Sequence, residues 1–400
     1  MRIWLPPSPA KDTWSLPRNV LRLGRLRCCL LAWLAACAEP DAQGPGLAEV
    51  APVRVAVLDE GFGGYEALLG GALPSAVEAH LHAGSEAVSH GTAVAEVVHA
   101  LAPEAELVLV SFVGREDFPG VVAGLEALNV DIVVASVGWD NVAALDGTSP
   151  WTSAVDTFLA SSGALWFNAA GNSADATRRG PLTAARGRVA FSGAASTPVY
   201  TAGGSLSVRL RATAGATLSG LQLLAWEEDG SLCASRAAVA GAAVLELDTA
   251  CASDTVRVTI EGVLDVEGAE GVLWARHGFM GGAAPAPSSL AVPADTRHGL
   301  TVGVCDPVAD TVSAFSGRGP TEDGRTKPDL CAADGLTTET AGPRAFTGTS
   351  AANAWVGGLA ARLWGDLGDA EAVRAALRER AVDLQKRGVD DATGWGAPVD

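Results

Sequence analysis

The chain reads VRVAVL at residues 53–58, HGTAVAEVVHALA at 90–102, ELVLVSF at 106–112 and DIVVASVG at 131–138. The short runs are apolar at nearly every position, which is typical of strands buried on both faces of a sheet. The longer segments, including GVVAGLEALN at 120–129, have the length and pattern of helices. This alternation predicts an α/β fold, a three-layer, doubly wound and mostly parallel sheet with helices on both faces.

The pattern continues to NAAGN at 168–172, breaks near Ala174 and resumes with LTVGVCD at 300–306. Roughly between residues 190 and 290, apolar and polar side chains alternate instead, as at Leu206, Val208 and Leu210 against Ser207, Arg209 and Arg211. Such alternation indicates antiparallel strands with one buried face. We therefore predict an inserted antiparallel, sandwich-like β domain at 190–290, between two parts of the main domain at 53–189 and 291–400. The run GGAAPAPSS at 281–289 marks its far boundary.

Composition limits the possible partners of this 400-residue chain. Hydrophobic residues make up 48% and charged residues 18%, so most of the chain is expected to fold. The formal net charge of −18 disfavours binding to nucleic acid or to anionic lipid surfaces.

The first 37 residues have the pattern of a signal peptide. Arg18, Arg22, Arg25 and Arg27 precede the apolar run CLLAWLAAC at 29–37, which is too short to span a bilayer. Its last four residues resemble the lipobox of bacterial lipoproteins, which implies lipidation of Cys37, membrane anchoring and a flexible tether at 38–52. The alternative is an ordinary secretory leader. In either case the protein is expected to be exported, to the periplasm, the outer membrane or the exterior.

Four cysteines lie in the body of the chain. If the protein is exported, an even set favours disulfides, and Cys233–Cys251 with Cys305–Cys331 is the simplest of three possible pairings because each pair lies within one local stretch. The alternative is four buried thiols.

Three residues lie where catalytic side chains are often found. Asp59 directly follows the first predicted strand, at the carboxyl edge of the sheet where open α/β proteins bind their ligands. His90 opens the next helix, with Ser89 as a possible cap and Gly91 allowing close approach. Ser350 opens a late helix, where N–H groups can stabilise a developing oxyanion. Each alone has a structural explanation, but together they follow the order Asp, His, Ser of one serine-protease triad.

Five stretches resemble motifs of the subtilisin-like serine peptidases, the subtilases, in the family's order. They are VAVLDEGF at 55–62, SHGTAVA at 89–95, NAAGN at 168–172, FSGRGPTEDGRTKPDLCAADG at 315–335 and FTGTSAA at 346–352. The resemblance implies a monomeric serine endopeptidase acting on protein or peptide substrates, with Asp59, His90 and Ser350 as the triad, and with no cofactor or metal required for the chemistry. It also implies roles for seven further residues. Asn172 would be an oxyanion donor, Ser136, Val137 and Gly138 would pair with extended substrate, and Ala169, Ala170 and Gly171 would line the primary specificity pocket.

Three positions depart from the family's pattern. Glu60 stands where the family usually has Ser or Thr, Glu96 where it often has Gly, and Ala354 where it commonly has Pro. None of these changes removes a reacting atom. If Glu60 or Glu96 approached His90, its negative charge would raise the pKa of His90 and shift activity to higher pH.

Other interpretations remain open at this stage. His80 and His82 form an HxH pair that could bind a metal together with His90, although solvated loop histidines are the simpler explanation. Bound structural calcium is left open. The chain could instead be a catalytically weak or inactive surface lipoprotein that binds a partner through its inserted β domain, or an enzyme that passes the acyl group to an amine rather than to water.

Overall fold

The computed structural model describes residues 52–399, except for residues 186–187, 214–215, 265–268 and 283. The predicted signal peptide, Cys37 and all of the predicted tether except Pro52 lie outside the described residues. Within these ranges no helix has the length and apolarity needed to cross a membrane.

The main domain is built around one sheet that is mostly parallel, as predicted. Among the described residues its strands are β1 (Arg54–Asp59), β2 (Glu78–His80), β3 (Glu106–Ser111), β4 (Ile132–Ala135), β6 (Leu165–Ala169), β17 (Leu300–Asp306), β18 (Thr311–Val312) and β19 (Leu330–Ala332). The order is β18-β17-β6-β4-β1-β3-β2, with β19 paired to β17. All neighbours are parallel except β17 and β18.

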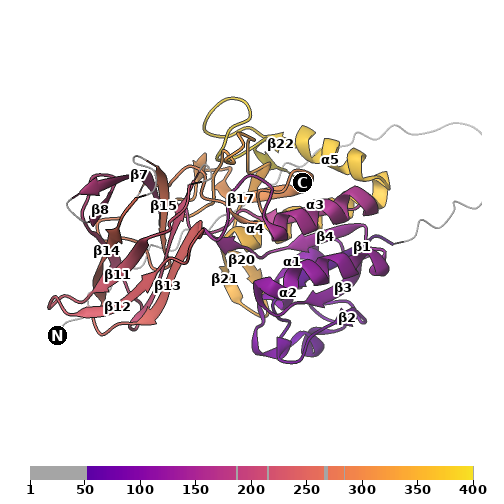
Figure 1. The fold of residues 1–400 in the computed structure, drawn as a ribbon. Coiled ribbons are helices and arrows are strands. Elements are labelled where there is room, and N and C mark those ends of the chain that lie inside the picture. Colours follow the sequence, from indigo (N-terminus) through magenta and orange to yellow (C-terminus); the bar gives the residue numbers. More distant parts are fainter. Residues whose placement is uncertain (1–51, 186–187, 214–215, 265–268, 283, 400) are drawn as a thin grey trace, which may run out of the picture. The chain divides into compact units, whose positions relative to one another are not determined.

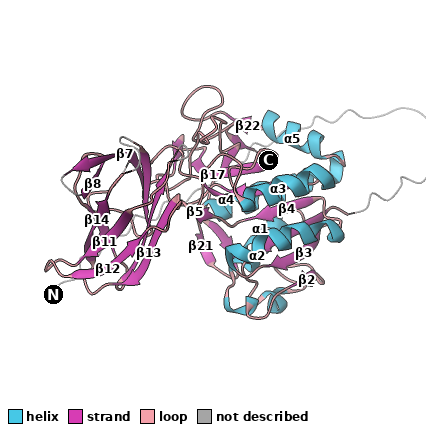
Figure 2. Ribbon diagram, in the orientation of Figure 1, coloured by secondary structure: helices cyan, strands magenta, loops and turns pink. Residues whose placement is uncertain are grey.

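Helices cover both faces of this sheet (Figures 1 and 2), which makes the three predicted layers. The helices are α1 (His90–Leu101), α2 (Gly114–Gly124), α3 (Pro150–Ser162), α4 (Thr349–Leu367) and α5 (Ala370–Glu379), with short 3₁₀ turns η1 (Tyr65–Leu68), η2 (Ser85–Ala87) and η3 (Leu125–Leu128). Helices α1 and α4 contact each other on one face, and α2 contacts α3 on the other.

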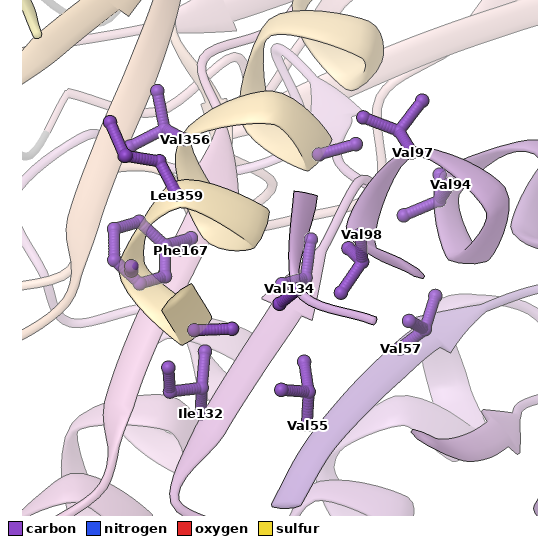
Figure 3. Close-up of a cluster of buried hydrophobic side chains, with 14 of the residues drawn as sticks. Val55, Val57, Val94, Val97, Val98, Ile132, Val134, Phe167, Val356 and Leu359 are labelled. Atoms are coloured by element: carbon purple, nitrogen blue, oxygen red, sulfur yellow. The ribbon is translucent and has the colours of Figure 1, made fainter. Parts of the chain in front are cut away.

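The strands need helices on both faces because their side chains are apolar on both. In β1, Val55 and Val57 point toward α1 and α4, whereas Ala56 and Leu58 belong to the core under α2 and α3. Figure 3 shows the first of these cores, where Val98 of α1 lies close to strand residues such as Val134. Full burial of a valine side chain stabilises a fold by about 1.5–3 kcal/mol, so this two-sided pattern strongly favours the layered arrangement.

A second, antiparallel sheet lies between the two parts of the main domain in the chain. Its described strands are β7 (Thr177–Ala185), β8 (Arg188–Phe191), β9 (Thr197–Tyr200), β10 (Ser205–Ala212), β11 (Leu221–Trp226), β12 (Leu232–Ala237), β13 (Val244–Ala250), β14 (Thr255–Gly262) and β15 (Glu270–Ala275). The order is β12-β11-β14-β8-β7-β15-β10-β13, with β9 on β14, and its apolar side chains form a separate core.

The limits of this sheet differ from those expected from the sequence. It begins at Thr177 and ends at Ala275, rather than near 190 and 290. The sequence of β7 begins TRRGP, which has no alternation of apolar and polar residues, so its strand character comes from pairing with β15 and β8. After Ala275 the chain stays on this sheet as far as Phe279, which pairs with Val199 and belongs to the separate core. It then returns to the main domain at β16 (Ala291–Val292).

Three small hairpins or ladders complete the described fold. Strand β16 pairs antiparallel with β5 (Trp139–Asp140), β20 (Leu336–Thr338) pairs with β21 (Gly342–Phe346), and β22 (Ala381–Val382) pairs with β23 (Ala397–Pro398). The β20–β21 hairpin directly precedes α4, so it leads the chain to Ser350.

A buried ion pair joins the second sheet to the main domain. Arg211 of β10 is 2% exposed, and its Nη2 and Nη1 donate to the carboxylate of Glu322 at 2.5 and 3.1 Å. Its Nε donates to Asn141 Oδ1 at 3.0 Å. Asn141 directly follows β5, and its amide donates back to the carbonyls of Arg209 and Val272 on the second sheet. The two sheets therefore share one hydrogen-bonded polar network.

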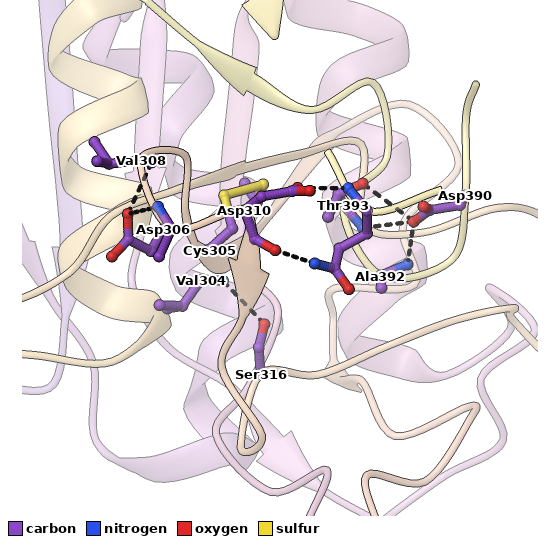
Figure 4. Close-up of a disulfide and its surroundings, with 12 residues drawn as sticks. Val304, Cys305, Asp306, Val308, Asp310, Ser316, Asp390, Ala392 and Thr393 are labelled. Atoms are coloured by element: carbon purple, nitrogen blue, oxygen red, sulfur yellow. Dashed lines mark hydrogen bonds between the residues drawn. A yellow bond between two sulfur atoms is a disulfide. The ribbon is translucent and has the colours of Figure 1, made fainter. Parts of the chain in front are cut away.

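Two disulfides lie in separate parts of the fold. Cys233 is bonded to Cys251 and Cys305 to Cys331, with Cα–Cα distances of 5.7 and 5.6 Å. These are the pairs that the sequence favours. Figure 4 shows the disulfide at Cys305, beside which the Ser316 hydroxyl accepts from the Val304 N–H at 2.9 Å. This bridge joins β17 to β19 at the edge region of the main sheet.

Replacing Arg211 with Met tests the joining network. The change removes both hydrogen bonds to the Glu322 carboxylate and leaves it only Arg179 Nη1 at 3.6 Å, and breaking one half of a buried pair costs up to about 3–5 kcal/mol of unfolding free energy. Urea denaturation should show this loss, whereas Arg236→Met on the exposed strand β12 should change stability by less than about 0.5 kcal/mol. Adding Glu322→Leu to Arg211→Met should recover part of the loss. Equal effects of the two arginine changes would contradict this account.

Candidate active site

Asp59 is the last residue of β1, which lies at the topological switch point of the sheet, where the strand order reverses. From β1 the chain forms β2 and β3 on one side of β1 and then crosses to β4 on the other side. Open α/β sheets bind ligands at such a point, outside the carboxyl ends of the strands. The Asp59 side chain is 3% exposed, so its charge needs hydrogen-bond partners.

His90 supplies the main partner. Its Nδ1 lies 2.7 Å from Asp59 Oδ2, and the Glu60 N–H donates to Asp59 Oδ1 at 2.9 Å. His90 is the first residue of α1, and Gly91 brings the helix close, since a Cβ there would lie 2.7 Å from the Asp59 Cβ. The predicted role of Gly91 is confirmed. Ser89 occupies the N-cap position, but its side chain makes no capping hydrogen bond, so that expectation is wrong.

The surroundings of His90 favour its protonated form. Burial of the ring opposes protonation, but the hydrogen bond to Asp59 and the charges of Asp59 and Glu60 outweigh it and raise the pKa of His90 above 6.5. The expected effect of Glu60 on the pKa of His90 is present, and the expected shift of activity to higher pH stays a prediction. Glu96 instead binds backbone elsewhere, because its carboxylate accepts from the N–H groups of Glu339 and Thr340 at 2.5 and 3.0 Å and stabilises the turn between β20 and β21.

Ser350 is the second residue of α4, beside the end of β4. Its hydroxyl donates to the Ser136 carbonyl at 3.2 Å, and the Ser136 hydroxyl donates to the Ser350 carbonyl at 3.1 Å. Leu58 pairs with Ala135, so Asp59 and Ser136 follow at the same level on neighbouring strands. Ser350 therefore lies at the same edge of the sheet as the Asp59–His90 pair, and in this structure its hydroxyl bonds to Ser136.

Asn172 follows β6 and is hydrogen-bonded to Thr349, the first residue of α4. Its Oδ1 accepts from the N–H and the hydroxyl of Thr349 at 2.8 and 3.0 Å. These two donors orient the side-chain amide so that its NH₂ is the end left to donate to a ligand. Gly348 makes this possible, because its φ is +87° and a Cβ there would lie 3.0 Å from the Asn172 Nδ2.

The segment Ser136–Gly138 continues from β4 in an orientation set by a residue that the sequence analysis missed. Asn168, fully buried in β6, donates to the Val137 carbonyl at 3.2 Å, while Trp166 Nε1 donates to Asn168 Oδ1. The Val137 carbonyl therefore points inward, whereas that of Ser136 faces Ser350. The available sequence signal for Asn168 was its position in the NAAGN motif, but its hydrogen-bond partner, Val137, is 31 residues away in the chain.

The segment Ala169–Gly171 ends β6 on the other side of Ser350. The Ala170 N–H donates to the Val302 carbonyl, and the Gly171 N–H donates to the Thr349 hydroxyl at 3.2 Å. Both segments that the resemblance assigns to substrate binding thus flank the start of α4. The structure brings the ten predicted site residues to this edge of the main domain.

The histidines of the suggested metal site have different partners. His80 Nε2 lies 2.6 Å from Glu78, and His82 Nδ1 lies 2.8 Å from the Ser111 hydroxyl, whereas His90 contacts Asp59. Among the described residues, the one group with metal-ligand spacing is Glu227 with Cys233 and Cys251. Those two sulfurs are joined in a disulfide and are not thiolate ligands.

The fold is that of an α/β protein with a hydrogen-bonded Asp59–His90 pair and Ser350 at the carboxyl edge of its parallel sheet. Comparison with known families gives a match of residues 280–396 to the Subtilase family. The fold is similar to that of the CspB protease of Clostridium perfringens, with a TM-score of 0.59 and 16% identity over 86% of this chain and 92% of that chain. No curated protein sequence matches the chain. The predicted fold and the predicted resemblance to the subtilases are confirmed.

Other solved structures give lower scores. The prenylagaramide maturation protease PagA has a TM-score of 0.46 and 15% identity, over 87% of this chain and 90% of that chain. MycP1 from Mycobacterium smegmatis has a TM-score of 0.43 and 17% identity, over 86% of this chain and 77% of that chain.

Removing the charge of Glu60 should lower the pKa of His90. In Glu60→Gln the neutral imidazole, the form that accepts a proton, should therefore persist to lower pH. NMR titration of the His90 ring measures this shift directly. Glu96→Gln is the matched control and should leave the pKa of His90 unchanged, because its carboxylate stabilises the β20–β21 turn. An unmoved pKa in Glu60→Gln, or equal shifts in both proteins, would refute the assignment.

Proposed function

We propose that the chain is a serine endopeptidase that hydrolyses peptide bonds through an acyl-enzyme on Ser350. The observation that carries the proposal is the 2.7 Å hydrogen bond between His90 and Asp59, at the sheet edge beside Ser350. A buried carboxylate that holds one imidazole nitrogen leaves the other nitrogen to accept a proton from a nucleophile. The match of residues 280–396 to the Subtilase family, which includes Ser350, supports the same activity.

In the proposed reaction, substrate binding redirects the Ser350 hydroxyl. In the structure this hydroxyl donates to the Ser136 carbonyl. A backbone N–H of an extended peptide would compete for that carbonyl and free the hydroxyl to turn toward His90. His90 then accepts the proton as Ser350 Oγ attacks the peptide carbonyl, and later returns it to the leaving amine. Asp59 orients the ring and stabilises the imidazolium form.

Negative charge develops on the carbonyl oxygen during the attack. We assign its stabilisation to the Asn172 NH₂ and the N–H of Ser350 in the first turn of α4, where helix N–H groups have no partner within the helix. These donors are preorganised, since Thr349 fixes the Asn172 amide and Gly348 permits the close approach. Water then attacks the acyl-enzyme, with His90 as its base.

The second sheet supports the segment that would pair with substrate. Arg209 donates to the Asp140 carbonyl at 2.9 Å, and Arg211 contacts Asn141. Both contacts lie just beyond Gly138. In this proposal the inserted domain stabilises the substrate-binding segment.

We also propose that the protein is exported. The two disulfides support this, since such bonds persist in oxidising compartments and are rare in the cytosol. Lipidation of Cys37 stays a prediction, tested by intact mass of the mature protein.

Fluorophosphonate labelling tests the nucleophile. The purified chain should be labelled at Ser350, located by peptide mapping, because the His90–Asp59 pair activates that hydroxyl. Ser350→Ala should abolish labelling and His90→Ala should reduce it strongly, while Ser153→Ala, a serine on the helix α3, should leave it unchanged. No labelling of Ser350 in a folded sample would overturn the proposed activity.

Substitution of Asn172 tests the oxyanion assignment. Asn172→Ala should lower turnover of a peptide substrate by on the order of 100- to 1000-fold, the range known from a subtilisin, with little change in KM. Asn172→Asp is the matched variant, because it keeps an acceptor for Thr349 but lacks the NH₂ donor. Its turnover should fall at least as far. Retained turnover in Asn172→Asp would mean that Asn172 acts only by positioning Thr349.

A further inference from the structure

The backbone N–H groups at the start of α4 have different acceptors. The Thr349 N–H donates to Asn172 Oδ1 at 2.8 Å, and the first two N–H groups after Ser350 donate to the Gly348 carbonyl at 3.0 and 3.4 Å. The Ser350 N–H has no partner among the residues that the structure describes, which leaves it available to an oxyanion. The N–H of Gly348 is the remaining one in this turn, and its acceptor is Asp334.

Asp334 accepts this N–H through a short hydrogen bond. Its Oδ2 lies 2.7 Å from the Gly348 nitrogen, across 14 residues of the chain. A bond from an N–H group to a carboxylate is roughly twice as strong as one between neutral groups. Asp334 is partly buried and belongs to the stretch 315–335, where the sequence analysis assigned no site residue. The structure therefore shows a contact at the start of α4 that the motifs alone did not indicate.

The carboxylate of Asp334 is carried by a well-anchored part of the main domain. Asp334 comes two residues after β19, whose residues are all buried. This strand pairs with β17 and is joined to it by the Cys305–Cys331 disulfide. On its other side β17 pairs with β6, the strand that leads to Asn172. Asp334 and Asn172 thus follow the carboxyl ends of parallel strands in one sheet, and both bind the start of α4.

Gly348 lies between these two contacts in an unusual conformation. Its φ is +87° and its ψ is 178°, a region that essentially only glycine adopts. Such a conformation persists where the surroundings determine it. Asp334 binds the N–H of the peptide unit before Gly348, and Asn172 binds the N–H of the peptide unit after it. The two bonds together fix the turn that places the Ser350 N–H relative to the Asn172 amide.

We propose that Asp334 is a positioning residue for the oxyanion site. It holds Gly348 so that the Ser350 N–H and the Asn172 NH₂ converge on one carbonyl oxygen. This inference rests on the proposed peptidase activity and adds a residue that contacts neither the substrate nor the Ser350 hydroxyl. Without the bond the turn at Gly348 can rotate and the two donors separate, and a misplacement of about 1 Å can slow catalysis about 100-fold.

The same bond also lies near the base of the β20–β21 hairpin. The hairpin is already closed there by the pairing of Leu336 with Phe346. The bond from Gly348 to Asp334 fixes the chain beyond that pair, where it enters α4. A role confined to the hairpin would change stability alone, whereas a positioning role would change the reactivity of Ser350 in the folded protein.

The test measures the rate at which a fluorophosphonate labels Ser350 in each purified protein. The phosphoryl oxygen of the probe takes the place of the oxyanion, so the rate depends on both donors. Asp334→Ala should slow labelling by roughly 10- to 100-fold. Asp334→Asn keeps an oxygen acceptor for the Gly348 N–H and removes only the charge, so it should restore the rate to within about fivefold of the unmodified protein.

Two further proteins complete the comparison. Asp334→Glu keeps the charge but moves the acceptor by one methylene, so it should slow labelling at least about tenfold, and it replaces the alanine variant if that one does not fold. Asp369→Ala is the matched control. Asp369 accepts the Ala372 N–H at 2.8 Å at the start of α5, a helix that carries no site residue. Its loss should lower the melting temperature and leave the labelling rate unchanged.

A double variant tests whether Asp334 acts with Asn172. In a protein that already carries Asn172→Ala, the two donors no longer have to converge. Asp334→Ala should then slow labelling by less than about fivefold, because residues that act as a unit are not additive. Independent effects would instead multiply, and the factor would be the same in both backgrounds to within about twofold. That result would refute the positioning role.

The remaining outcomes separate this inference from the proposed activity. If Ser350 of the folded, unmodified protein is not labelled, the proposed activity is wrong and the role of Asp334 falls with it. If Ser350 is labelled and a folded Asp334→Ala protein reacts as fast as Asp369→Ala, the activity stands and the positioning role is refuted. Labelling of Asp334→Asn as slow as that of Asp334→Ala would also refute it, because the acceptor oxygen alone would then not suffice.

Discussion

The buried carboxylate of Asp59 depends on its hydrogen bond with His90. Asp59 is 2% exposed at the end of β1, and a charge in such a place is costly without a partner. His90 supplies that partner at 2.7 Å, and this requires the first turn of α1 to lie against the end of β1. Gly91 is the position where helix and strand touch. The same contact that stabilises the carboxylate also determines which imidazole nitrogen remains available for chemistry.

Glycine backbones make the rest of the site possible. At Gly348 the chain has a positive φ and passes so close to Asn172 that a side chain would collide with its amide. At Gly138 and Gly171 two backbones approach the single methyl group of Ala291. The site is therefore shaped by the close approach of main-chain segments.

The second sheet is energetically part of the same site. Its Arg211 is buried and forms a bidentate ion pair with Glu322 of the main domain, and its Arg209 donates to the Asp140 carbonyl. These contacts converge on the residues that follow Gly138. A buried charge needs its partner, so displacement of the second sheet would leave Glu322 unpaired. The insert and the segment after Gly138 are thereby coupled, even though their cores are separate.

The sequence by itself determined the class of fold, because apolar strands and helical segments are local patterns that repeat from Val53 onward. It also located Asp59, His90 and Ser350, since each stands at the boundary of a predicted strand or helix. Only the tertiary structure showed that the second sheet begins at Thr177. The sequence of β7 has no alternating pattern, and its strand is formed through pairing with neighbouring strands. Likewise, only the structure separated Glu60 from Glu96 and revealed the contacts of Asn168. Their roles arise from contacts between residues far apart in the chain, and no local pattern records such contacts.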